Sequence, residues 1–370
     1  MNKNERALFL ELCRFRSSSQ VKLNKLITLG AATFRVLGAL FSNRMAALAY
    51  GVLRGCALLP KTDREFRNSL KNAYLQNCQR NESYFACVEM LSDILRSGRD
   101  AYALLKGAYL CRWYPEGYRT SNDIDILTES RSVTRIGRLL TEAGFCRGYI
   151  RSDVLVPAAR QEIIASKMLR GETVPYIKEV NLPFMRYLEV DINFSLDYKH
   201  AEDHTVSAFL SRAAETELRG LRLMTLDRYD FLIHLCSHLY KEAAAYPWIE
   251  MKRDMTLYKF CDIYALLNGF GGQDFEILGS RALETDTADA CFYALYMTKA
   301  LFDIRQKDLE TFLHGFAAGR ENLLQLVARP AEKKTYRYLV SDPKQRFFTE
   351  NRLRLLEEVR NYACTCDAQA

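Results

Sequence analysis

The sequence predicts an α+β fold in which a mixed centre lies between two helical regions. Helical periodicity dominates residues 1–98 and 206–370, whereas residues 99–205 contain short apolar runs with the alternating pattern of strands. The chain has 370 residues, which is long for one domain. We therefore expect a helical N-terminal region (1–98), a core (99–205) and a helical C-terminal domain (206–370).

The N-terminal region is predicted to contain helices only. They are expected over Arg6–Phe15, Leu26–Phe41, Met45–Leu59, Asp63–Gln79 and Tyr84–Ser97. Asp63 follows a loop containing Pro60 and is a suitable N-cap for the helix after it.

The centre is predicted to alternate strands with short helices. Strands are expected over Ala101–Leu105, Asp123–Leu127, Phe145–Val156, Val174–Val180 and Arg186–Phe194, and helices over Ala108–Tyr114, Ser132–Ala143 and Gln161–Leu169. Gly144 is a normal helix stop. Beyond residue 206, helices are expected over Thr225–Tyr240, Met255–Leu267, Thr285–Phe302, Leu309–Phe316 and Gln345–Tyr362.

Composition predicts a soluble, cytoplasmic protein. Hydrophobic residues make up 49% of the chain and charged residues 26%, and eleven scattered cysteines without a C-x-x-C motif indicate reduced thiols. The first twenty residues are charged and unlike a signal peptide. The apolar runs Leu26–Phe41 and Met45–Pro60 are shorter than a membrane span, so we expect no transmembrane segment. Buried helices are the favoured interpretation, and an interfacial membrane helix is the alternative.

Positive charge is concentrated in the first hundred residues. They hold 16 Lys or Arg and 8 Asp or Glu, a net charge of +8, while the whole chain carries +7. Such a region can face RNA, an acidic partner or anionic lipid. A solvated helix surface explains the charge equally well, and no aromatic-interleaved basic stripe favours RNA.

The most informative motif is the strand Asp123-Ile124-Asp125-Ile126. Side chains alternate along a strand, so both aspartates project to one face and both isoleucines to the other. Two carboxylates on one face repel unless a cation lies between them, and hard divalent cations prefer oxygen ligands. The pair therefore predicts a metal site.

A third aspartate follows on a separate strand. Asp191 alternates with Val190 and Ile192 and shares its face with Asn193. If the two strands are neighbours, three carboxylates converge and can hold two Mg²⁺ ions for phosphoryl transfer. In that arrangement Asp191 is the candidate to help accept the proton of the attacking hydroxyl.

A small-residue turn, Lys106-Gly107-Ala108, precedes the D-x-D strand. Glycine lets backbone N–H groups approach a phosphate, and the helix after it adds positive potential. Lys106 and Arg119 can each meet phosphate charge. The alternatives are a surface lysine beside a turn and, for Arg119, a structural partner of Asp123 or Asp125.

The runs LLKGAYL…YRTSNDIDIL and EVDINF, taken together, resemble the polymerase-β-like nucleotidyltransferase superfamily, and within it a largely uncharacterised bacterial group. The resemblance covers about residues 100–270, extending toward 305. It implies a small mixed sheet flanked by helices, with Asp123, Asp125 and Asp191 as ligands of Mg²⁺. Lys106, Gly107, Ala108 and Arg119 would then hold the phosphates of a nucleoside triphosphate such as ATP.

The sequence departs from the family pattern at two positions. Ala108 stands where a second glycine or a serine is common, and Asn193 stands where the closest group often has histidine. The implied reaction moves a nucleoside monophosphate from an NTP to an acceptor hydroxyl on a small molecule, a peptide or protein, or RNA. The alternatives are a catalytically silent nucleotide-binding scaffold and a toxin-like enzyme acting on tRNA, because R-x-S-x-D-I-D also resembles abortive-infection toxins.

Two H-x-x-x-H pairs, His200/His204 and His234/His238, have a spacing that can ligate zinc from one helix face. Neither contains the glutamate of H-E-x-x-H. We therefore expect these histidines to be packed in the core, and the alternative is that they line a cleft opposite the D-x-D strand. No G-x-S-x-G, Walker A or dinucleotide-binding pattern occurs, which argues against hydrolase, P-loop and dehydrogenase functions.

Overall fold

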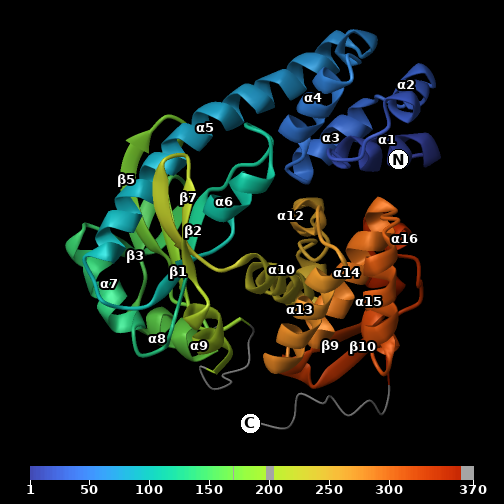
Figure 1. Cartoon of the computed structure of the whole chain (residues 1–370). Coiled ribbons are helices and arrows are strands. Elements are labelled where there is room, and N and C mark those ends of the chain that lie inside the picture. Colours follow the sequence, from blue (N-terminus) through green and yellow to red (C-terminus); the bar gives the residue numbers. More distant parts are fainter. Residues whose placement is uncertain (170, 197–203, 360–370) are drawn as a thin grey trace. The chain divides into compact units, whose positions relative to one another are not determined.

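The computed structural model describes residues 1–169, 171–196 and 204–359 (Figure 1). The chain forms two compact units, and the boundaries between them fall inside three helices, at residues 46/47 and 51/52, 66/67 and 231/232. The sheet unit comprises residues 47–51 and 67–231, and the helical unit comprises residues 1–46, 52–66 and those from 232 onward. No described helix is both long and apolar enough to cross a membrane. All nine cysteines in the described part are free thiols.

The sheet unit is built on eight strands in the order β4-β3-β5-β6-β2-β1-β8-β7. The strands are β1 (Tyr102–Leu104), β2 (Asp123–Thr128), β3 (Cys146–Arg151), β4 (Val154–Pro157), β5 (Tyr176–Leu182), β6 (Met185–Asn193), β7 (Ala214–Leu218) and β8 (Leu221–Thr225). The helices are α5 (Arg64–Arg96), α6 (Gly107–Leu110), α7 (Val133–Glu142), α8 (Arg160–Leu169) and α9 (His204–Ser211). A large mixed sheet with helices agrees with the predicted α+β class.

The sheet is larger than the small sheet that the resemblance implied, because two hairpins extend it. Ser152 and Asp153, with φ of 48° and 59°, connect β3 to β4, so one predicted strand becomes two. Arg219 and Gly220, with φ of 53° and 79°, connect β7 to β8 in a region predicted to be helical. Two-residue turns with positive φ are typical of tight hairpins.

One face of the sheet is packed against helices. Helices α5 and α7 lie along the sheet (Figure 1). Apolar residues of the second half of α5 and of α7 form one buried cluster with Ile124, Ile126, Val190 and Ile192, which are all fully buried. The separate helices predicted over 63–79 and 84–97 are one continuous helix, α5. The glycine stop of α7 is confirmed: Gly144 has φ of 88°, and the N–H of Phe145 donates to the carbonyl of Leu140 at 2.9 Å.

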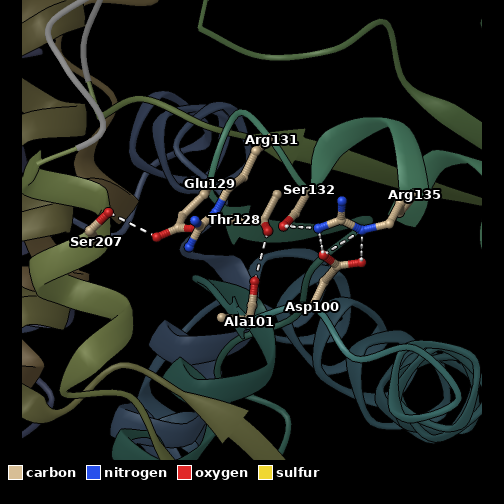
Figure 2. Close-up of polar contacts among 8 residues, drawn as sticks. All are labelled: Asp100, Ala101, Thr128, Glu129, Arg131, Ser132, Arg135 and Ser207. Atoms are coloured by element: carbon tan, nitrogen blue, oxygen red, sulfur yellow. Dashed lines mark hydrogen bonds and ion pairs between the residues drawn. The ribbon is translucent and has the colours of Figure 1, made fainter.

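Polar contacts connect the start of β1 and the end of β2 to each other and to helices α7 and α9. The guanidinium of Arg135 on α7 donates to both carboxylate oxygens of Asp100, just before β1 (Figure 2). The hydroxyl of Thr128 donates to the carbonyl of Ala101 at 2.7 Å. Glu129 accepts a 2.9 Å hydrogen bond from Ser207 of α9. These contacts fix β2, the strand that carries the D-x-D motif, at its C-terminal end.

The helical unit contains α1 (Lys3–Cys13), α2 (Gln20–Thr28), α3 (Phe34–Ser42), α4 (Ala46–Gly55), α10 (Arg228–Ala243), α11 (Tyr246–Glu250), α12 (Leu257–Leu267), α13 (Gly272–Glu284), α14 (Ala288–Phe302), α15 (Lys307–Ala317) and α16 (Pro343–Phe347). Residues 47–51 of α4 and 228–231 of α10 belong to the sheet unit. The helix predicted over Leu26–Phe41 is divided between α2 and α3, where Gly30 adopts a φ of 73°.

A second, three-stranded sheet lies in the helical unit. It consists of β9 (Leu326–Arg329), β10 (Lys334–Tyr338) and β11 (Leu356–Glu358), in the order β11-β10-β9. The helix predicted over 345–362 is therefore wrong within the described residues, since α16 ends at Phe347 and β11 follows; residues 360–362 lie outside them. Leu353, Leu355 and Leu356 pack against a small core cluster that includes Tyr338, so tertiary contacts outweigh the helical periodicity.

Candidate active site

Two neighbouring strands bring the predicted aspartates together. β2 and β6 are parallel and directly paired, with Asp125 opposite Asp191 and Asp123 opposite Glu189. Register partners in a sheet project to the same side, as do residues two apart on one strand. Asp123, Asp125, Asp191 and Glu189 therefore share one face, and the apolar residues between them point into the core.

Lys106 lies against this acidic face. Its Nζ is 2.9 Å from Oδ1 of Asp125, and the same oxygen accepts a 3.3 Å hydrogen bond from the Asn193 amide. The Lys106 side chain is 23% exposed and that of Asp125 only 5%. The backbone of Lys106 has φ of 46° and ψ of −110°, an uncommon conformation for a residue with a side chain. Lys106 is thus a largely buried counter-ion and not a surface lysine.

Gly107 is required by packing. A Cβ at this position would lie 2.5 Å from both the Cβ of Ser121 and the hydroxyl oxygen of Tyr84. The hydroxyl of Tyr84 in turn donates to the carbonyl of Asp123 at 3.3 Å. The glycine therefore allows α6 to approach the start of β2, which is a reason independent of any phosphate. Ala108, the next residue, is fully buried.

The loop that leads into β2 supplies further polar contacts. Ser121 donates to Oδ1 of Asp123 at 3.0 Å. Arg119 is 9% exposed, and its carbonyl accepts a 3.0 Å hydrogen bond from Asn81 of α5. The positive charge of Arg119 also helps to lower the pKa of Asp123. Arg119 is therefore held within electrostatic reach of the carboxylates.

The pKa values show how strongly the carboxylates interact. Burial, followed by repulsion from Asp125, raises the pKa of Asp191 well above its ordinary value, and burial together with Asp123 raises the pKa of Asp125 despite the nearby Lys106. Burial and the two β2 aspartates also raise the pKa of Glu189. For Asp123, burial is outweighed by Lys106 and by hydrogen bonds, so its pKa is lowered. Negative charge is crowded on this face, and an additional cation would stabilise it.

Glu189 and Asn193 are contributors that the sequence analysis did not assign to the site. Both alternate with apolar residues on β6, as Asp191 does, so this alternation was the available signal. Their contribution to the site depends on the register between β2 and β6, which places Glu189 opposite Asp123 and lets the Asn193 amide donate to Asp125. Strand register cannot be read from a single strand's pattern.

The three aspartates that the sequence predicts as magnesium ligands lie on one face of the sheet. Three aspartates on one face of two adjacent strands offer the hard oxygen ligands that Mg²⁺ prefers. Within the described ranges, however, no three His, Cys, Asp or Glu side chains are already grouped as a metal site. The ammonium of Lys106 occupies the acidic face beside Asp125 instead.

The histidine pairs are only partly within the described residues. His200 lies outside them, and His204 is the first residue of α9. On α10, the ring centroids of His234 and His238 are 6.3 Å apart, and Nε2 of His238 is 3.5 Å from Oε1 of Glu242. Glu242 also pairs with Lys259 of α12. These residues form a polar cluster within the helical unit.

Comparison with known families gives the class of protein. Residues 34–303 match the model of a nucleotidyltransferase family. The match covers more than half of the chain, so the chain belongs to this family, which is described as that of the uncharacterised nucleotidyltransferases. The match begins at Phe34 and thus extends farther into the N-terminal region than the resemblance near residue 100 suggested. A comparison with curated proteins found no similar sequence.

Proposed function

We propose that the chain transfers a nucleoside monophosphate from an NTP to an acceptor hydroxyl. The hydroxyl oxygen attacks the α-phosphorus, the bond from that phosphorus to the bridging oxygen breaks, and pyrophosphate leaves. Membership of the nucleotidyltransferase family supports the donor half of this reaction. The observation that carries the proposal is the direct pairing of Asp125 with Asp191, with Asp123 on the same face.

Asp123, Asp125 and Asp191 are the residues that would hold two Mg²⁺ ions. When bound, these ions would neutralise charge on the triphosphate and orient the reacting oxygens. Asp191 is the member of the set on the second strand, and we assign to it the acceptance of the hydroxyl proton. This assignment rests on the position of Asp191 on β6, directly opposite Asp125.

The positive side chains would bind the triphosphate. Lys106 and Arg119 both lie within electrostatic reach of the acidic face, and the Gly107-Ala108 backbone begins α6 beside it. Arginine forms two parallel hydrogen bonds to phosphate, whereas lysine acts as a point charge. The proposal specifies the acceptor only by its chemical group, a hydroxyl of a small molecule, a protein or an RNA end.

A labelling experiment tests the transfer. The purified chain is incubated with each α-³²P-labelled NTP, Mg²⁺ and a cell extract, and label is followed into RNA, protein and small-molecule fractions. Asp123→Asn removes a carboxylate from the acidic face, while Glu217→Gln removes one from an exposed position on β7. We expect labelling by the wild type and by Glu217→Gln and its loss in Asp123→Asn.

A catalytically silent nucleotide-binding scaffold gives a different result. It binds Mg-NTP in isothermal titration calorimetry but labels no fraction above the Asp123→Asn background. That result, or equal labelling by Asp123→Asn and wild type, would exclude the proposed reaction.

A further inference from the structure

A pocket of about 760 Å³ lies within the helical unit, where the C-terminal ends of α1 and α12 meet the loop after α14. Sites for small molecules commonly have volumes of about 300–1,000 Å³. The wall includes the ring of Tyr264, which stacks on Phe302 with centroids 5.0 Å apart and shares a 2.7 Å hydrogen bond with Ser17. The pocket is large enough for a compound of nucleotide size, and contacts with Phe302 and Ser17 hold the aromatic ring on one side of it in place.

The lining carries an excess of positive charge. Arg14, Lys22 and Arg305 line the pocket, and the acidic residue of the lining is Asp303. Asp303 is already paired with Lys344, whose Nζ is 2.5 Å from its Oδ1. Its negative charge is therefore offset by Lys344, a cation outside the lining.

A buried carboxylate holds two of these cations in place. Glu11 is 1% exposed and accepts a 2.7 Å hydrogen bond from the backbone N–H of Ser19. Lys22 is 2.7 Å from Oε2 of Glu11, and Arg14 is 3.7 Å from the same oxygen. Because Glu11 fixes both cations beside the pocket, a ligand would not have to order them, and this preorganisation favours binding.

Arg14 also has an unsatisfied donor. Its Nε is buried and has no hydrogen-bond partner in the described part of the chain. Buried N–H groups are nearly always paired, and leaving one unpaired is costly. The guanidinium of Arg14 therefore keeps hydrogen-bonding capacity that the described residues do not use.

The three cations belong to segments beyond the family match. Arg14 and Lys22 precede residue 34, and Arg305 follows residue 303. The pocket therefore has a wall within the matched region, at Tyr264, and its three cations lie outside that region on both sides. A terminal phosphate carries a charge of about −1.5 to −2 at neutral pH and offers several acceptor oxygens. It complements the excess positive charge of the pocket lining.

From this arrangement we propose that the pocket binds a terminal phosphate monoester, which either a sugar phosphate or the 5′-phosphate of an RNA can supply. The proposal does not depend on the nucleotidyltransferase reaction. Binding is therefore measured in EDTA with the full chain, so that metal-dependent binding of nucleotide does not contribute. The probes are ribose 5-phosphate, a 5′-phosphorylated RNA decamer and the same decamer with a 5′-hydroxyl.

The variants are Arg14→Gln and Arg305→Gln, with Lys25→Gln as the matched control. Lys25 is an exposed residue of α2 that does not line the pocket. Arg305 is also exposed, so its replacement leaves folding intact even if Arg14→Gln does not fold. Loss of one charged contact to phosphate is expected to weaken binding about tenfold.

The proposal predicts that ribose 5-phosphate binds, or that the phosphorylated decamer binds at least about tenfold more tightly than its hydroxyl counterpart. Calorimetry and fluorescence anisotropy measure these dissociation constants. Arg305→Gln should weaken the phosphate-dependent binding, and Lys25→Gln should leave it unchanged. Three results would overturn the proposal: no binding of any probe, equal binding of the two decamers without binding of ribose 5-phosphate, or equal effects of Arg305→Gln and Lys25→Gln.

Discussion

Replacement of Lys106 by methionine tests how the acidic face is held together without metal. The substitution keeps much of the side chain's length and apolar volume but removes the ammonium that lies 2.9 Å from Asp125. Asp125 and Asp191 then remain crowded without the Lys106 ammonium, and burial already disfavours their charged forms. We expect a loss of stability of the sheet unit.

The size of the loss follows from the burial of the pair. Removing one partner of a buried ion pair costs about 3–5 kcal/mol. Lys106 is 23% exposed, so solvent reduces this cost, and we expect about 2–3 kcal/mol for Lys106→Met. For a unit of this size, 1 kcal/mol lowers the Tm by about 2–4 °C, so the expected fall is about 4–12 °C.

The assay is thermal unfolding in EDTA and in a Mg²⁺ titration, followed by circular dichroism. Lys71→Met, at an exposed position on α5, is the control for loss of a lysine. A ligand that binds the folded state raises the Tm, and Mg²⁺ should do so more in Lys106→Met than in wild type because the ammonium no longer competes for Asp125. If Lys106→Met unfolds at the wild-type temperature in EDTA, Lys106 is not the counter-ion of the acidic face.

Three further substitutions have expected outcomes. Gly107→Ala forces a Cβ against Tyr84 and should cost about 1–3 kcal/mol in urea unfolding, and wild-type stability would contradict the packing role of the glycine. Arg135→Ala removes hydrogen bonds that lower the pKa of Asp100. A carboxyl whose pKa is lowered by folding stabilises the fold above its unfolded pKa, which is about 3.9 for aspartate. The difference in Tm between variant and wild type should therefore shrink as the pH falls below that value. A difference that is constant from pH 7 to pH 3 would refute this linkage. Glu189→Gln removes a crowded charge and should raise the Tm in EDTA, whereas a lower Tm would show that this carboxylate stabilises the fold.

Much of the sheet unit could be predicted because its signals are local. Asp123 and Asp125 alternate with buried isoleucines, which identifies both the strand and the face, and Gly144 ends α7 as its position predicts. The adjacency of β2 and β6 was stated as a condition, since a single sequence shows alternation but not which strands pair. Their pairing, with Asp191 opposite Asp125, therefore came from the structure.

The hairpin β7–β8 was missed because its pattern is weak. The run Ala214–Leu218 is polar at most positions and has no continuous apolar stretch, and the two-residue turn at Arg219-Gly220 lacks the common Asn-Gly pair. Its strand character comes from pairing with β1, in which Thr225 is opposite Leu104. The second sheet was missed for a similar reason, since the leucines of residues 353–356 have helical spacing but pack on the small core cluster that includes Tyr338. In both regions long-range contacts decide the secondary structure.

The same two strands explain why the acidic face can exist at all. Like charges on β2 and β6 oppose folding, and Lys106 is the lysine that contacts them. The opposite face of those strands buries Ile124, Ile126, Val190 and Ile192 completely against α5 and α7. Burying one such side chain contributes about 1.5–3 kcal/mol, and this apolar burial opposes the repulsion among the carboxylates on the other face. Alternation at period two therefore accounts for both faces of these strands, since the residues that bury the core alternate with the carboxylates of the acidic face.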